Sequence, residues 1–200
     1  MADLEGIAEP LDGRVARRQR NVDAVIDVVL ELFAEESLFP TIEQAATRSG
    51  LSLRSLYRYF ADPGELLEAT IKRSREQGVE FSRLHAIGQG PLAQRIDEFA
   101  AMRLRMYDAI GAVYRATVAN AARHPRISNE LARNRNELRH QFEAQFVREL
   151  AERKPADRDV VLSAGDLLTQ LDSIDYLRRH RQLSVAETQS VLVSTLRSLL

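Results

Sequence analysis

The chain has 200 residues, which suffices for one mid-sized domain or for a small domain joined to a larger one. Hydrophobic residues make up 44% of it and charged residues 28%, so the disordered and collagen-like classes are excluded. The absence of cysteine excludes disulfide frameworks, thiol nucleophiles and cysteine-ligated metal sites, and 28 basic against 29 acidic side chains give a net charge of −1.

A net charge near zero argues against nucleic-acid binding only as an average, because it does not say where the charges lie. No uncharged stretch approaches the roughly 18 residues that a membrane helix needs. The first residues are acidic, whereas a signal peptide begins basic and continues apolar. The sequence therefore predicts a cytoplasmic protein without a membrane partner.

The amino-terminal segment divides into a tail and a basic cluster. Residues 1–13 hold two glycines and a proline without apolar periodicity, which predicts a mobile tail. Four arginines follow without an intervening acid: Arg14, Arg17, Arg18 and Arg20. Such a cluster is either a solvated charge run or an arm that contacts DNA, and its place directly before a helix favours the arm.

Four helices are predicted in the amino-terminal part. The first has an apolar face with helical spacing and ends near Ser37, because Pro40 disfavours helical geometry at the residue before it. Thr41 and Gln44 form a capping box for the second helix, and Gly50 suits the left-handed turn that ends it.

The next two helix starts carry equally clear signals. Ser52 is placed to cap a third helix over 53–60, and Asp62 with Pro63 supplies the N-cap and first-turn proline of a fourth over 64–84. The glycine-rich break that follows marks a boundary, so the predicted domains are 14–86 and 87–200.

Helical patterns continue through the second domain. Its predicted breaks lie near 108–111 and before Pro125, Pro155 and Ser184, and Ser184 also opens a capping box. No segment alternates with period two for long enough to be a strand. The predicted fold class is therefore all-α, with about nine helices.

The segment 41–60 is typical of a helix-turn-helix: a helix, a glycine turn, and a helix that is apolar on one side and polar and aromatic on the other. Leu51, Leu56 and Phe60 are placed in the core. The residues predicted for the outer face are Leu53, Arg54, Ser55, Tyr57, Arg58 and Tyr59. Such a helix fits the major groove of B-DNA, which is about 12 Å wide, while capping hydroxyls and N-terminal amides meet phosphates.

Residues 20–67 resemble the DNA-binding domain of tetracycline-repressor-like (TetR family) transcriptional regulators. The resemblance rests on Leu32-Phe33-Ala34, Gly50-Leu51-Ser52, the LYRYF run at 56–60 and Glu65-Leu66-Leu67. It implies an all-helical homodimer whose carboxy-terminal bundle binds an effector and dimerises through its last two helices. The predicted function is a sequence-specific regulator, a repressor released from a pseudo-palindromic double-stranded DNA operator by a small-molecule effector.

Position by position, the resemblance implies two sets of DNA contacts. The residues placed near phosphates are Thr41, Ser52, Tyr57 and Arg58. The residues placed at base edges are Leu53, Arg54 and Ser55. Tyr59 is a further predicted contact, and packing against the core is the alternative for both tyrosines. Family members usually carry a phosphate-binding lysine where this sequence has Pro63.

Polar and aromatic residues that interrupt apolar faces in the second domain are predicted to line an effector pocket. They are Arg103, Tyr107, Tyr114, Asn120, Phe142, Phe146, Asp172 and Tyr176, with Asp175 beside them. The two aspartates lie three residues apart on one helical face, which suits a cation, a pair of arginines or solvent, and solvent is the favoured interpretation. The mixed lining suits a hydrophobic or amphipathic effector.

The sequence predicts no enzyme, no cofactor and no metal site. The histidines at 85, 124, 140 and 180 lack the i, i+4 spacing of a helical zinc site, and neither a Gly-x-Ser-x-Gly elbow nor a phosphate-binding glycine loop is present. The alternative is a helical ligand or lipid carrier, or an enzyme, with a degenerate helix-turn-helix. Retention on heparin or nonspecific DNA at low salt discriminates between these functions.

Overall fold

The computed structural model describes residues 13–36, 40–84 and 86–200, and every regular element in these ranges is helical. The amino-terminal helices are α1 (Gly13–Glu36), α2 (Ile42–Ser49), α3 (Leu53–Tyr59) and α4 (Pro63–Phe81). The later ones are α5 (Leu92–Ala121), α6 (Pro125–Gln145), α7 (Val147–Ala151), α8 (Pro155–Thr169), α9 (Leu171–Asp175), a π-helix (Tyr176–His180) and α10 (Val185–Leu199). The predicted tail, apart from Gly13, and the predicted helix end at Ser37 lie outside the described residues.

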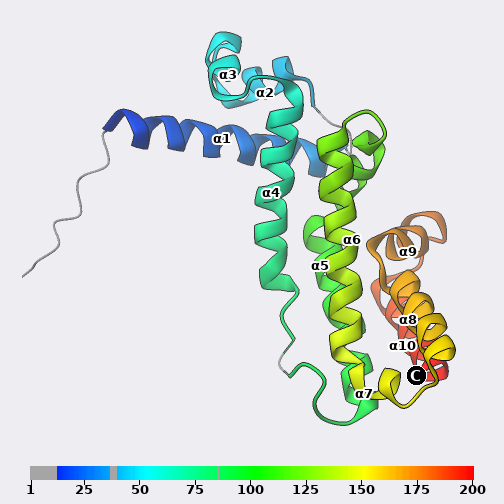
Figure 1. Cartoon of the computed structure of the whole chain (residues 1–200). Coiled ribbons are helices and arrows are strands. Elements are labelled where there is room, and N and C mark those ends of the chain that lie inside the picture. Colours follow the sequence, from blue (N-terminus) through cyan, green and yellow to red (C-terminus); the bar gives the residue numbers. More distant parts are fainter. Residues whose placement is uncertain (1–12, 37–39, 85) are drawn as a thin grey trace, which may run out of the picture.

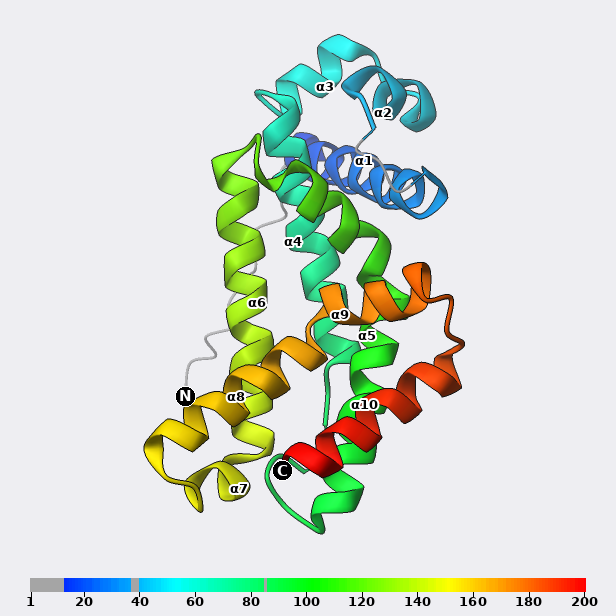
Figure 2. The same cartoon turned by 90° about the vertical axis from the view of Figure 1, so that its right-hand side faces the viewer.

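The helices are arranged as a small head on an elongated body. In Figures 1 and 2, α1 crosses one end of the molecule, α2 and α3 lie above it, and α4 runs from the head into the body. There α4 packs against α5 and α6, and α5 also contacts α9 and α10. Helix α3 therefore lies at an extremity of the molecule and continues through a short turn into a helix of the body.

Buried apolar side chains form two cores. The core of the head contains Val25, Phe33 and Leu56, and it also includes Val113 from α5 and Ile127 from α6. The core of the body gathers side chains of α5, α6, α8, α9 and α10. The predicted division at residues 86 and 87 thus falls between α4 and α5, but the head core crosses it.

The predicted helix caps are confirmed. Thr41 accepts a hydrogen bond from the backbone N–H of Gln44, whose side chain accepts one from the N–H of Thr41, so the capping box is complete. Gly50 has φ +68°, the left-handed geometry that favours glycine. Ser52 and Asp62 cap α3 and α4 through their side-chain oxygens. These short-range signals set the turn angles of the helix-turn-helix.

Two predictions about helix boundaries are wrong. Helix α1 already begins at Gly13, so the arginine cluster occupies its first turns and does not form a separate arm. Residues 14–20 contain arginine, alanine and glutamine, which favour helix, and no glycine or proline. The break expected at 108–111 does not exist, because α5 runs unbroken from Leu92 to Ala121 with Gly111 buried against the ring of Tyr107.

Two breaks were not predicted. Helix α6 ends at Gln145 and α7 begins at Val147, and α8 and α9 are separated by Gln170, whose backbone is extended. With the π-helix, the described residues hold ten α-helices and one π-helix, where about nine helices were predicted. The breaks before Pro125, Pro155 and Ser184 are confirmed.

Substitution of Gly165 by alanine tests the packing of α8 on α6. A Cβ at this position would lie 2.0 Å from Cζ of the buried Phe142 ring. Gly165→Ala should therefore lower the free energy of unfolding by about 1–3 kcal/mol, measured by urea denaturation. Gly13→Ala, whose Cβ would meet none of the described atoms within 4 Å, is the control and should not lower the free energy of unfolding. A Gly165→Ala protein as stable as the wild type would contradict this packing.

Candidate nucleic-acid interface

The outer face of α3 is exposed as the sequence predicts. Leu53 and Tyr57 are 41% and 51% exposed, and the side chains of Arg54 and Arg58 also face solvent. Leu56 and Phe60 lie in the head core, while Ser55 is half-buried. The exposed Leu53 and Tyr57, each directly followed by an exposed arginine, offer both apolar and charged contacts to a ligand.

The caps at the starts of α2 and α3 are also on the surface. Thr41 and Ser52 are exposed, and the hydroxyl oxygens of Ser52 and Ser55 lie 3.0 Å apart. A hydroxyl that accepts from a backbone N–H can still donate its own proton outward. Both caps can therefore donate to an anion at a helix N-terminus, where the helix dipole favours negative charge.

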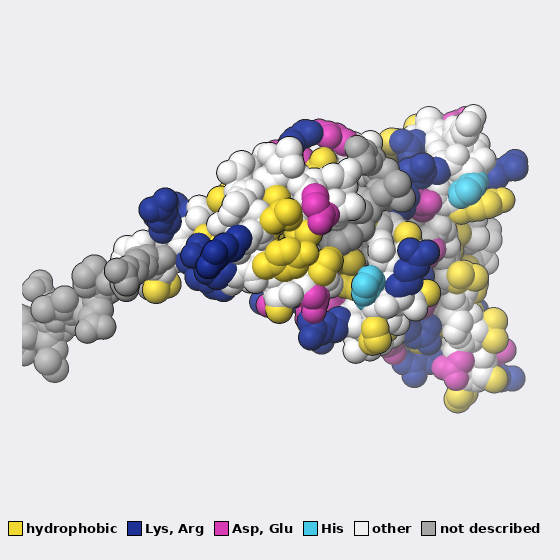
Figure 3. All heavy atoms as spheres, turned by 90° about the horizontal axis from the view of Figure 1, so that it is seen from above, with side chains coloured by type: hydrophobic (Ala, Val, Ile, Leu, Met, Phe, Trp, Pro, Cys, Tyr) yellow, Lys and Arg dark blue, Asp and Glu magenta, His cyan; other side chains and the backbone are white. Residues whose placement is uncertain are grey.

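A groove of about 480 Å³ lies between the start of α1 and α3. The residues that line it are Arg17, Arg18, Asn21, Leu51, Ser55, Arg58 and Tyr59. No acidic residue is among them, although the whole chain is nearly neutral. Figure 3 looks down on the α2–α3 end and shows basic side chains gathered beside the start of α1, next to an apolar patch. The groove is a local site of positive potential.

Tyr59 lies inside this groove and not on the outer face of α3. Its side chain is 8% exposed, and its hydroxyl accepts hydrogen bonds from Asn21 Nδ2 at 2.9 Å and from Arg58 Nη2 at 3.3 Å. These bonds, the one from Asn21 first, lower the pKa of the Tyr59 hydroxyl because they stabilise its ionised form. Burial favours the packing alternative for Tyr59. Tyr57 remains on the surface.

Arg14 and Pro63 are two further residues of the head that the sequence singled out. The side chain of Arg14 lies outside the described residues, whereas Arg17 and Arg18 line the groove from α1. Pro63 occupies the first position of α4, directly after the Asp62 cap. Sequence reasoning did not single out Asn21, because only the fold places an α1 amide beside a tyrosine 38 residues away.

Three residues predicted to line an effector pocket are core residues instead. Phe142 and Phe146 pack edge-to-face against Phe99 in the body core, with ring centroids 5.8 and 5.3 Å from that of Phe99. Arg103 is fully buried and donates to Gln141 Oε1 at 2.6 Å and to the backbone oxygen of Leu138 at 2.7 Å. Burial lowers the pKa of Arg103 to about 9, so the guanidinium still carries its charge at neutral pH.

Asp172 is hydrogen bonded to an arginine and a tyrosine, so the solvent interpretation of it is wrong. Its Oδ2 accepts from the Tyr114 hydroxyl at 2.6 Å and from Arg135 Nη2 at 2.9 Å. Burial, with the hydrogen bond to Asp172 next in importance, raises the pKa of Tyr114. The arrangement ties α5 and α6 to α9.

Asp175 repeats this pattern one turn later. It accepts from the Tyr107 hydroxyl at 2.7 Å and pairs with Arg115 at 3.3 Å. Burial, followed by the bond to Asp175, raises the pKa of Tyr107 to about 12. Two further predicted pocket residues lie elsewhere: Asn120 donates to the backbone of α5, and Tyr176 is exposed and stacks on His180.

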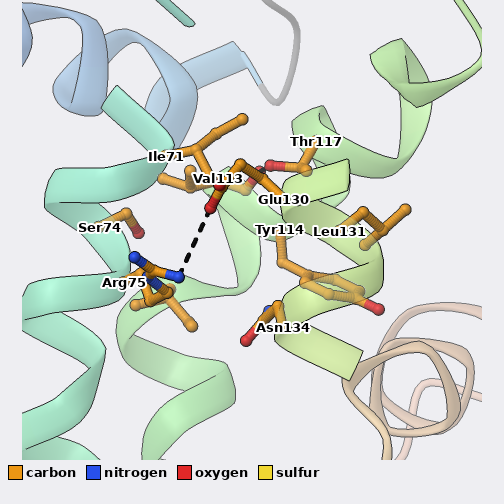
Figure 4. Close-up of a pocket in the computed structure, with 10 residues that line it drawn as sticks. Ile71, Ser74, Arg75, Val113, Tyr114, Thr117, Glu130, Leu131 and Asn134 are labelled. Carbon is orange, nitrogen blue, oxygen red and sulfur yellow. Dashed lines mark hydrogen bonds and ion pairs between the residues drawn. The ribbon is translucent and has the colours of Figure 1, made fainter. Parts of the chain in front are cut away.

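A cavity does exist, between α4, α5 and α6 (Figure 4). Its volume is about 30 Å³, and its lining residues are Ile71, Ser74, Arg75, Ile110, Val113, Tyr114, Thr117, Glu130, Leu131 and Asn134. Only Tyr114 was predicted. Glu130 Oε2 is buried there without a hydrogen-bond partner among the described residues, 3.6 Å from Arg75 Nη1. The sequence signal that was missed is the presence of Ser74 and Thr117 on buried helix faces.

The described residues contain no helix long and apolar enough to cross a membrane. Their head, with a capped pair of short helices, a left-handed glycine turn and an exposed second helix, defines a helix-turn-helix protein. No protein-family model matches the chain.

The solved structures that align with the chain include transcriptional regulators of the TetR family. The chain aligns with a TetR-family regulator from Streptomyces coelicolor at a TM-score of 0.69 and 22% identity, over 90% of this chain and 80% of the other. It aligns with the multidrug binding protein EbrR, complexed with imidazole, at 0.66 and 19%, over 98% and 97% of the two chains. The chain therefore has the TetR fold, and the predicted all-α class and family resemblance are confirmed.

Curated relatives match in sequence over a shorter stretch. The transcriptional regulators named BetI from Klebsiella pneumoniae and Escherichia coli are 35% identical over 82 residues. The match covers 40% of this chain and 40% of each relative's length. The chain thus shares with them a segment about as long as a helix-turn-helix head.

The arginines on α1 are tested by removing them together. Arg17→Ala with Arg18→Ala should weaken binding to every duplex sequence and lower the slope of log affinity against log salt by about one per lost phosphate contact. Fluorescence anisotropy with a nonspecific duplex over a salt series measures both. Arg148→Ala with Lys154→Ala removes the same charge from exposed positions in the body and should leave the slope unchanged. An unchanged slope in the α1 variant would remove these arginines from the interface.

Proposed function

We propose that this chain is a sequence-specific DNA-binding transcriptional regulator, a repressor that a small-molecule effector releases from a pseudo-palindromic operator. The observation that carries the proposal is the exposed face of α3 beside a groove with three arginines and no acidic residue. Helix-turn-helix proteins place such a helix in the major groove and hold it there by backbone contacts. The BetI relatives, which match 82 residues of the chain, are helix-turn-helix transcriptional regulators, and this supports the proposal.

In this proposal the start of α3 reads bases and its surroundings hold phosphates. Leu53, Arg54 and Ser55 occupy the first turn of α3, the part of a recognition helix that contacts base edges. Leu53 suits a thymine methyl group and Arg54 a guanine edge. The phosphate contacts come from Thr41, Ser52, Tyr57, Arg58 and the arginines of α1.

We further propose that two copies pair through α8 and α10. These helices pack against each other and still expose apolar side chains, with Val160 and Leu167 at 67% and 69% exposure and Val185 and Val191 also on the surface. An apolar face of this kind is typical of an interface between subunits. A two-fold dimer would place its recognition helices about 34 Å apart, one turn of DNA.

The effector is proposed to act through the cavity between α4, α5 and α6. Its present volume holds about two waters, so a drug-sized ligand must push the lining side chains apart. Helix α4 lines the cavity and follows α3 after a short turn, so a shift of α4 moves the reading helix. EbrR, with the same fold, is a multidrug binding protein, which supports a small-molecule site.

A DNA-binding regulator of this kind would work in the cytoplasm and without a catalytic step. The relatives are transcriptional regulators and not enzymes. A helical carrier remains the second candidate, favoured by the cavity alone. It would leave the arginine groove without a ligand, and it predicts little retention on heparin at low salt.

Selection of bound duplexes from a random DNA pool tests the proposed function directly. The expected result is an enriched palindrome, because two symmetric α3 helices read two inverted half-sites. A protein carrying Leu56→Asp, which places a charge in the head core, is the folding-defective control. Recovery of no motif by the folded wild type would favour the carrier.

Changes at the first turn of α3 should alter the choice of operator. Arg54→Ala should relax preference at one base pair of each half-site, at a cost of about 1–3 kcal/mol for the preferred base. Competition between the selected operator and its single-base variants measures this. A uniform loss of affinity with the same ranking of variants would show that Arg54 contacts only the backbone.

A further inference from the structure

Tyr59 lies between the two helices that form the arginine groove. From α1, Asn21 donates a hydrogen bond to its hydroxyl, and the guanidinium of Arg18 lies 5.8 Å from the centre of its ring. From α3, Arg58 donates to the same hydroxyl, with its guanidinium 5.3 Å from the ring centre. One aromatic side chain therefore contacts two arginines and one amide.

We propose that Tyr59 is a positioning residue for DNA binding, which holds Arg58 and Arg18 toward phosphates and ties α3 to α1 without binding DNA itself. This inference rests on the proposed function. Tyr59 is too buried to present a face to a duplex, at 8% exposure, whereas its arginine neighbours are exposed.

The physical gain is preorganisation. An exposed arginine loses side-chain conformational entropy when it is held against a phosphate. A hydrogen bond and a ring face that already restrain the guanidinium reduce this loss at the moment of binding. The groove holds no carboxylate that would compete for Arg18 or Arg58, and neither forms an ion pair among the described residues. Tyr59 therefore restrains the arginines without neutralising them.

The bond between Asn21 and Tyr59 has a second consequence, for the orientation of α3. This helix has only seven residues, and its apolar anchors Leu56 and Phe60 face the head core. A hydrogen bond of 2.9 Å from α1 fixes the last turn of the helix on its groove side. Loss of this tie would leave the core packed but the arginines of α1 and α3 less firmly aligned.

Tyr59→Phe tests the proposal, because it removes one oxygen and keeps the buried ring. Its affinity for a nonspecific duplex at low salt should fall about fivefold, the effect of losing one ordinary hydrogen bond. The slope against salt should also decrease, as Arg58 spends less time on a phosphate. Tyr107→Phe, which removes the hydroxyl of a buried, hydrogen-bonded tyrosine in α5, should change neither quantity.

A double-mutant cycle separates positioning from direct contact. Both neighbours donate to the Tyr59 hydroxyl, so its own proton is free for a phosphate, and direct contact is the rival explanation. The cycle compares the change in log affinity that Tyr59→Phe causes in the wild type with the change that it causes in a protein that already carries Asn21→Ala or Arg58→Ala. If Tyr59 acts through its neighbours, the second change should be less than half of the first. An effect of full size in both backgrounds would overturn the proposal.

The outcomes also distinguish this inference from the proposed function. A wild-type protein that binds no duplex at low salt would contradict the function itself. A wild type that binds with a steep salt dependence, and a Tyr59→Phe protein that binds equally well, would overturn only the positioning role. If circular dichroism shows that Tyr59→Phe is not folded, Asn21→Ala replaces it. This variant leaves the tyrosine intact, and its affinity and salt slope are compared with those of the wild type in the same way.

Discussion

The packing of α5 against both cores is the constraint on which the rest of the structure depends. This helix has 30 residues, so it extends about 45 Å, and its buried side chains belong to the head core at one end and to the body core along the rest. Because α5 is continuous, head and body cannot bend at its centre. Helix α4 packs beside it, leads from α3 and contributes to the lining of the cavity between α4, α5 and α6.

The positive charge available to bind DNA is concentrated in one groove and is not a property of the whole chain. A chain with a formal charge of −1 has little overall attraction for DNA, yet three arginines share a groove without a carboxylate. Several acidic side chains elsewhere form ion pairs with arginines, as Asp172 does with Arg135 and Asp175 with Arg115. The groove where α1 meets α3 therefore carries local positive charge, so affinity for a polyanion would come from few contacts, and each phosphate contact would add about one to the slope of log affinity against log salt.

The parts that sequence predicted well are those set by neighbours in the chain. Thr41, Gly50 and Ser52 define the helix-turn-helix because caps and left-handed turns depend on a few adjacent residues. The prediction of a helix break at 108–111 was wrong because Gly111 is held in the helix by packing, which local propensity does not include. The sequence did not reveal that Tyr59 faces the groove, because its hydrogen-bond partner Asn21 lies 38 residues away in the chain.

The residues predicted to line the effector pocket depend even more on partners that are distant in the chain. Residues that interrupt an apolar face, such as Arg103 and Phe146, looked like pocket residues but complete the core through partners on other helices. The actual cavity collects side chains from three helices, so no single stretch of sequence reveals it. Tyr114 was found because it is both an aromatic on a buried face and a hydrogen-bonding group.

The shared head core also determines how this protein can be recombined with others. A fragment that stops at residue 86 lacks Val113, Ala116 and Ile127, three apolar side chains that cover its own interior. A chimera that exchanges DNA-reading heads between proteins of this fold therefore needs a junction that keeps these contacts, with matching residues at the end of α5 and the start of α6. Head and body form one packing unit, so under the proposed function a substitution on the exposed face of α3 would disturb the core less than an exchange of the whole head.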